Sequence, residues 1–134
     1  MRIHRLTTSR GLVVFVVSML LAQTAWSVDN DDLRFDNTED LFQICRVEVG
    51  QPEYAVTSFA CLGFIEGAVQ YHDAVTDRRN LKPLICYPKG TSIADGRAAF
   101  VAWAQKHSSN AKLMGELPVI GLVKALAAAY PCNR

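Results

Sequence analysis

The fold of this chain is decided by residues 61–75, which read Cys61-Leu62-Gly63-Phe64-Ile65-Glu66-Gly67-Ala68-Val69-Gln70-Tyr71-His72-Asp73-Ala74-Val75. At 3.6 residues per turn, the polar side chains fall on one narrow stripe, formed by Glu66, Gln70, Asp73 and, just beyond the stretch, Asp77. A helix whose polar side chains occupy only one narrow stripe must have its other sides buried against neighbouring parts of the protein. We therefore predict that this stretch is the central helix of a helical bundle.

Two glycines lie four residues apart in this stretch, at Gly63 and Gly67. A glycine inside a helix costs roughly 1 kcal/mol relative to alanine, so its presence calls for a reason. We predict that Gly63 and Gly67 serve helix packing by letting a neighbouring backbone come close. The alternative is that the helix simply tolerates them.

The flanking sequence predicts further helices on both sides of the central one. A first helix can be capped by Asn37 or Thr38, and the segment ends at Gly50-Gln51-Pro52. The central helix begins between Tyr54 and Thr57 and ends near Asp77. A capping box from Ser92 to Asp95 starts a third helix, and Pro118 suits the first turn of a fourth. With no strand pattern in view, we expect an all-α fold, a compact up-and-down bundle of four main helices.

The fourth predicted helix is unusually apolar. Lys124 is its only charged residue between Leu117 and Pro131. Such a helix is either buried on nearly all sides or meets another chain. The pattern leaves both a self-association face and simple burial open.

The first 27 residues are typical of a cleaved signal peptide. Arg2, Arg5 and Arg10 form a basic start, residues 12–22 are an apolar run, and Ala25-Trp26-Ser27 places small residues at a cleavage site. The alternative is an uncleaved anchor helix. We predict a flexible leader over residues 28–36 and a helical domain over residues 37–134, located in the periplasm after cleavage.

The charge of the remaining chain excludes two classes of partner. Of the 14 basic residues, three fall in the predicted signal peptide, which leaves 11 against 13 acidic residues and a net charge of −2. No basic cluster is present. We therefore expect neither nucleic acid nor an anionic membrane as a partner.

Four cysteines follow the predicted signal peptide, at Cys45, Cys61, Cys86 and Cys132. An even number in a small exported domain indicates two disulfides, whereas a zinc site would need closely spaced ligands that are absent here. In an up-and-down bundle with short loops, the first two cysteines lie at one end and the last two at the other. This geometry predicts the pairs Cys45–Cys61 and Cys86–Cys132.

Motifs for catalysis, cofactors and metals are absent, so we predict no catalytic, cofactor-binding or metal-binding residues. The sequence contains no H-E-x-x-H, no G-x-S-x-G and no phosphate-binding glycine loop. His72 and Asp73 are neighbours that diverge by about 100° on a helix, so we do not expect them to form an ordinary dyad. We interpret His72 as a core or boundary residue. The chain is a binding protein rather than an enzyme on this basis.

The cysteine framework resembles the Rap/Tai family of type VI secretion immunity proteins. The resemblance covers residues 41–132 and rests on motifs in the right order: Cys45, Cys61-Leu62-Gly63-Phe64-Ile65-Glu66-Gly67, Cys86-Tyr87-Pro88-Lys89-Gly90, Ala125-Leu126 and Tyr130-Pro131-Cys132. Residues 99–103 and Lys106-His107 are similar to the family's third helix, which commonly ends in His-Pro. Here Ser108 replaces that proline.

The resemblance implies a periplasmic, disulfide-bonded and often dimeric protein that binds and blocks a peptidoglycan amidase. It does not locate the inhibitory residues. From the residues themselves we predict a partner surface in exposed loops, with the candidates Tyr87, Lys89, Lys106, His107 and Lys112. The alternative for each is an ordinary solvated position. The alternative function is that of a general periplasmic acid-stress chaperone or envelope stress protein.

Overall fold

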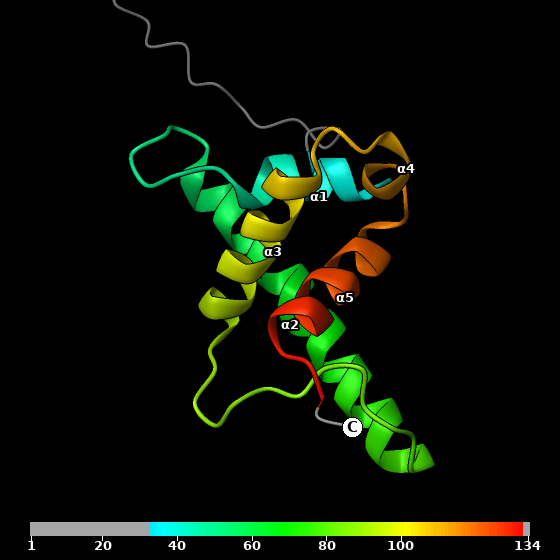
Figure 1. The fold of residues 1–134 in the computed structure, drawn as a ribbon. Coiled ribbons are helices and arrows are strands. Elements are labelled where there is room, and N and C mark those ends of the chain that lie inside the picture. Colours follow the sequence, from blue (N-terminus) through cyan, green and yellow to red (C-terminus); the bar gives the residue numbers. More distant parts are fainter. Residues whose placement is uncertain (1–32, 133–134) are drawn as a thin grey trace, which may run out of the picture.

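The computed structural model describes residues 33–132 and shows an all-helical domain within them (Figure 1). The predicted signal peptide, residues 1–27, and all but the last four residues of the predicted leader lie outside the described residues. The helices are α1 (Thr38–Cys45), α2 (Tyr54–Arg79), α3 (Ile93–His107), the short α4 (Ala111–Met114) and α5 (Pro118–Ala129). No strand occurs in this part of the chain, which confirms the predicted fold class.

The helix starts are set by local side chains, as predicted. Asn37 caps α1: its side chain accepts a hydrogen bond from the Asp40 backbone N–H, and the Asp40 carboxylate accepts one from the Asn37 N–H. Ser92 and Asp95 form the same reciprocal arrangement at α3. Two backbone donors that a helix start leaves unpaired are thus satisfied at each site. Pro118 occupies the first turn of α5.

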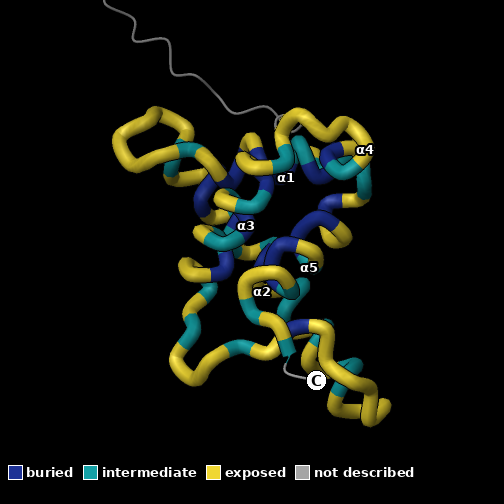
Figure 2. The backbone as a smooth tube through the Cα atoms, viewed as in Figure 1, coloured by how far each residue is buried: buried dark blue, intermediate teal, exposed yellow. Residues whose placement is uncertain are grey.

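The core lies where α1, α3, α5 and the first half of α2 meet, and Figure 2 shows the buried residues gathered there. Helix α2 has 26 residues and α3 has 15, so α2 is about 39 Å long and α3 about 22 Å. The C-terminal turns of α2 therefore extend past the other helices (Figure 1). No residue of α2 after Ile65 is fully buried. The acidic stripe is exposed as predicted, but the other sides of this half are only partly covered: Ala68 and Val69 pack against the core, whereas Tyr71 is 72% exposed.

The two glycines of α2 do not pack against another part of the described chain. Gly63 and Gly67 are exposed, and a Cβ added at either would meet nothing within 4 Å. The prediction of helix packing there was wrong for contacts within the chain, because the partner helices approach a different face of α2. The close approach occurs at Gly121 in α5, where a Cβ would lie 2.3 Å from the side chain of Thr38.

Thr38 explains why α5 needs a glycine at this point. Its side chain is fully buried, and its Oγ1 donates to the carbonyl oxygen of Glu116 over 3.0 Å. The Thr38 backbone N–H donates to the same carbonyl over 2.8 Å. These bonds hold the start of α1 against the chain that enters α5, at a distance that leaves no room for a methyl group.

Both predicted disulfides are present. Cys45–Cys61 joins residues 16 positions apart, and Cys86–Cys132 joins residues 46 positions apart. Cys45 and Cys61 are 0% exposed in the core, whereas Cys86 is exposed. The first disulfide connects α1 to α2, and the second connects the segment before α3 to the segment after α5.

Candidate functional site

The segment between α2 and α3, residues 80–92, is irregular in structure but fastened at several points. We call it the stapled loop. The Cys86 backbone N–H donates to the carbonyl oxygen of Tyr130 over 2.9 Å, beside the disulfide from Cys86 to Cys132. The Ile85 side chain is buried in the core. Because a disulfide, a backbone hydrogen bond and a buried side chain hold this loop, it has little conformational freedom to lose when it binds a partner.

His72 adds another attachment, from the side of α2. The backbone N–H of Leu84 donates to His72 Nε2 over 3.2 Å, so this nitrogen carries a lone pair and no proton. His72 Nδ1 then carries the proton and donates to Asp73 Oδ1 over 2.8 Å. The two side chains, expected not to form an ordinary dyad, are nevertheless hydrogen-bonded, because the exposed carboxylate bends back to reach the ring. Because the Nε2 lone pair is already used, His72 holds the loop and is not placed as a general base.

The stapled loop presents apolar side chains to solvent. Leu81 is 51% exposed and Leu84 is 62% exposed, while Ile85 next to them is buried. Tyr71, on the projecting half of α2, is also exposed. A set of large apolar side chains held on a rigid segment is typical of a surface that binds another protein.

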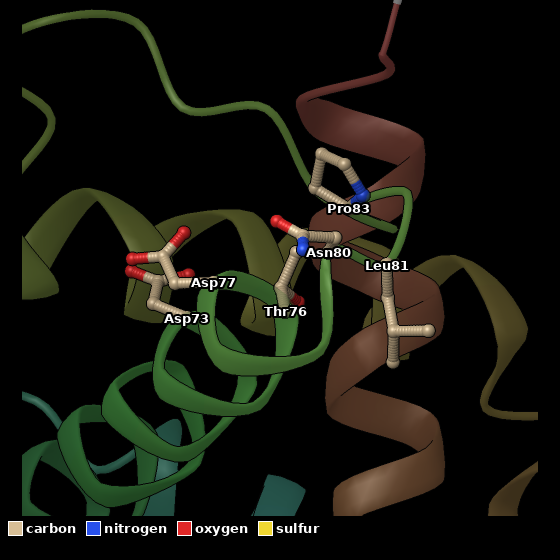
Figure 3. A pocket seen from close by; sticks show the side chains of 6 residues that line it. All are labelled: Asp73, Thr76, Asp77, Asn80, Leu81 and Pro83. Atoms are coloured by element: carbon tan, nitrogen blue, oxygen red, sulfur yellow. The ribbon is translucent and has the colours of Figure 1, made fainter.

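An open depression lies between the stapled loop and the end of α2 (Figure 3). Its volume is about 760 Å³, and it is lined by Asp73, Thr76, Asp77, Asn80, Leu81 and Pro83. Asp73 and Asp77 lie one helical turn apart and side by side in Figure 3. A second depression of about 900 Å³ includes Pro83 and Leu84 in its lining, along with the exposed disulfide. Pro83 lines both depressions, so both border the stapled loop.

Tyr87 was predicted as a partner-surface residue, but its hydroxyl points inward. The Tyr87 hydroxyl is buried and has no hydrogen-bond partner, and the ring lies 5.7 Å from that of Tyr130. Burial raises the pKa of Tyr87 to about 12, and the nearby carboxylate of Asp73 and the phenol of Tyr130 act in the same direction. Lys89, in contrast, is exposed in the turn that ends with the Thr91 N–H donating to the Pro88 carbonyl oxygen.

The other three predicted residues lie elsewhere. Lys106 and His107 end α3, and Lys112 lies in α4. Figure 1 places the end of α3 and α4 at the opposite end of the molecule from the stapled loop. His107 packs against the ring of Trp103, with the ring centres 4.7 Å apart. The structure thus separates the five predicted residues into two groups and does not bring them into one site.

Sequence reasoning missed Leu81 and Leu84. Their signal was present, because two leucines in a short segment with Pro83 between them are unusual in a solvated connection. What the sequence did not show is which of the apolar residues in the loop would turn inward. The residue that is buried is Ile85, whereas Leu81 and Leu84 are exposed to solvent.

Residues 33–132 contain no group of three or more His, Cys, Asp or Glu side chains that could hold a metal ion. Among the same residues, every helix is too short or too polar to cross a lipid bilayer. The stapled loop combines exposed leucines with the two depressions beside it, and these features make it the candidate functional site.

The model of a family described as Rap1a immunity proteins matches residues 37–132, which is most of the chain. A search of curated proteins and a search of solved structures found no match.

Proposed function

Because the chain belongs to the Rap1a immunity protein family, we propose that it protects its own cell by binding and inhibiting a type VI secretion effector that cleaves peptidoglycan as an amidase. The family supports a protein effector as the partner. The amidase class follows from the resemblance of the cysteine framework to Rap/Tai proteins. In this proposal the protein acts by occupying the effector and performs no chemistry of its own.

The observation that carries this proposal is the stapled loop. Binding orders the side chains and loops of an interface, and this ordering opposes association. A loop that a disulfide, His72 and Ile85 already hold in place pays little of that cost. Leu81 and Leu84 then supply apolar surface at the centre of the contact, and the charged residues beside them form its polar rim.

The cell compartment in this proposal is the periplasm. Disulfides persist in oxidising compartments, and Cys86 of the second disulfide is exposed where a cytosolic reductant would reach it. The predicted signal peptide over residues 1–27 supplies the route of export. An amidase that cleaves peptidoglycan would act in the same compartment.

We also propose that the protein forms a homodimer through α5. Leu117, Val119 and Ile120 are exposed apolar side chains at the start of this helix. Lys124, the only charge on α5, forms an ion pair with Glu116. The face is therefore apolar with a locally balanced charge, which suits contact with a second copy. Sedimentation should show a dimer that Ile120→Asp converts to a monomer; a monomeric unmodified protein would contradict this part of the proposal.

The test of the main proposal is protection of living cells. An exported amidase encoded next to this gene is expressed in the periplasm, alone and together with this protein. We expect lysis in the first case, rescue in the second, and a complex on gel filtration. No rescue and no complex would remove the immunity proposal. Suppression of aggregation of unrelated proteins at low pH would instead support the chaperone alternative.

Two variants of matched chemistry then locate the contact. Leu84→Asp puts a charge on the stapled loop, and Val49→Asp puts one on the loop between α1 and α2, where Val49 is 81% exposed. Both positions are solvated, so neither change should unfold the protein. We expect Leu84→Asp to weaken effector binding at least about 30-fold, equivalent to about 2 kcal/mol, and Val49→Asp to leave it unchanged.

A further inference from the structure

A small cavity lies behind the stapled loop, between α2, α3 and α5. Its volume is about 200 Å³, which is smaller than the roughly 300–1,000 Å³ of pockets that bury drug-sized ligands. Ile65, Val69 and Leu126 form its apolar floor, and Asp73, Tyr87 and Ser92 lie among the residues around it. Asp73 and Ser92 are exposed, so the cavity opens to solvent on their side.

Gly96 lies among the residues that line this cavity. A Cβ at Gly96 would lie 3.5 Å from Cγ2 of Ile65 and 3.7 Å from Cδ2 of Leu126, in ordinary van der Waals contact with two side chains of the floor. Gly96 is buried inside α3, where alanine would favour the helix. A methyl group at this position would therefore fit against Ile65 and Leu126 and would take up part of the cavity.

The polar groups of the cavity are of two kinds. The hydroxyls of Thr91 and Ser92 are already bonded, to the Pro88 carbonyl oxygen over 2.8 Å and to the Asp95 carboxylate over 2.7 Å. The Tyr87 hydroxyl is buried and unpaired. Asp73 is the only charged residue in the lining, and its Oδ1 accepts a hydrogen bond from neutral His72, so its negative charge is not cancelled.

An unpaired buried hydroxyl and a carboxylate above an apolar floor are complementary to a positively charged group on an aliphatic stem. Burying a hydroxyl without a partner is unfavourable, and a ligand that supplies one gains that difference. The volume suits one long side chain. An anion would be repelled by Asp73, and a purely apolar group would leave the Tyr87 hydroxyl unpaired.

We propose that this cavity binds a basic side chain, lysine or arginine, that the protein partner presents. The cation pairs with Asp73 and donates to the Tyr87 hydroxyl, and its methylene groups lie on Ile65, Val69 and Leu126. The choice of a protein partner rests on the proposed immunity function. The charge and size of the ligand rest on the cavity itself.

Free amines test the site without an effector. The probes are the amides of acetyl-lysine and acetyl-arginine, with the amide of acetyl-norleucine as the uncharged control of similar length. Each is titrated into isotope-labelled protein while backbone amide signals are followed by NMR. We expect the basic probes to shift signals in residues 65–73 and 87–96 with millimolar affinity, and the norleucine probe to shift them much less.

Variants separate a binding role from a structural one. Asp73→Asn should weaken the basic probes about tenfold, and so should Tyr87→Phe, since each removes one charge-assisted contact. Asp77→Asn is the matched control, because Asp77 lines the neighbouring depression and not this cavity. Gly96→Ala should abolish probe binding and raise the melting temperature.

Three results would overturn the proposal: no shifts with the basic probes, equal shifts with norleucine, or equal weakening by Asp73→Asn and Asp77→Asn. Each would mean that the cavity holds only solvent or binds without regard to charge. Such a failure would leave the immunity function standing, because rescue from an amidase does not use these probes. If rescue failed while the basic probes still bound, the immunity function would be contradicted and the binding of basic groups in the cavity would stand.

Discussion

The two disulfides hold two regions that differ in nearly every other respect. Cys45–Cys61 lies in the core, is 0% exposed at both residues, and joins α1 to α2. Cys86–Cys132 lies beside an open depression, with Cys86 exposed, and fixes a segment without regular structure. The first disulfide adds to packing that would exist without it. The second holds an irregular surface in one shape, so the same kind of bond supports packing in one region and the proposed recognition surface in the other.

The largest effect should come from removing the core disulfide. Its loop of 16 residues corresponds to about 3 kcal/mol on the chain-entropy model, and truncating two fully buried side chains adds lost packing. For Cys45→Ala/Cys61→Ala we expect a loss of about 5 kcal/mol in the free energy of unfolding, measured in urea. That is a large part of the stability of a domain of this size.

Removing the exposed disulfide should destabilise the fold less than removing the core disulfide, but it should weaken effector binding more. The loop of 46 residues gives about 4 kcal/mol on the same model, but the native loop regains freedom when Cys86→Ser/Cys132→Ser releases it. We expect a loss of about 2 kcal/mol on unfolding and faster hydrogen exchange in residues 80–92. A larger loss of stability than in the core variant would contradict the distinction between the two regions.

Glycine substitutions test the same contrast without touching a disulfide. Gly121→Ala should destabilise by about 1–3 kcal/mol, because the new methyl group would meet Thr38 in the core. Gly63→Ala is the matched control on exposed α2, where alanine should stabilise by up to about 1 kcal/mol. Thermal unfolding of both variants gives the comparison. If Gly63→Ala destabilised the monomer, α2 would be covered in a way that the structure does not show.

The smallest effect concerns Tyr87 at high pH, because the residue is only partly buried and solvent screens its electrostatic interactions. Its pKa is raised from 10.0 to about 12, so between these values the folded protein keeps a proton that the unfolded chain has lost. The stability that this group contributes is present below pH 10.0 and is lost as the pH rises through about 12. In Tyr87→Phe the fall of unfolding free energy over this range should be shallower. An absorbance titration of the phenolates should also lose its last step.

The features that the sequence predicted correctly depend on residues close to one another or on simple connectivity. The capping boxes at Asn37 and Ser92 involve partners three residues away, so the pattern contains the whole interaction. The disulfide pairing followed from short loops between alternating helices. The family resemblance rested on the same framework.

The features that the sequence did not predict depend on contacts between distant segments. Helices α1 and α3 approach a face of α2 that does not include Gly63. The glycine that allows a close approach is Gly121 in α5, which lies against Thr38. The inward turn of Tyr87 follows from the attachments of Cys86 and Leu84 to groups 44 and 12 residues away. No local pattern encodes those distances, so the candidate site was found only in part.

Hydrogen exchange of the protein with and without the proposed amidase effector tests the central claim most directly, since it compares the two ends of the molecule in one measurement. We predict that the effector protects backbone amides in residues 71–84 and in the stapled loop, and leaves residues 46–53 unchanged. The same pattern should disappear in Leu84→Asp. Protection confined to residues 46–53 and to the connection between α3 and α5 would contradict the account and move the recognition surface to the opposite end.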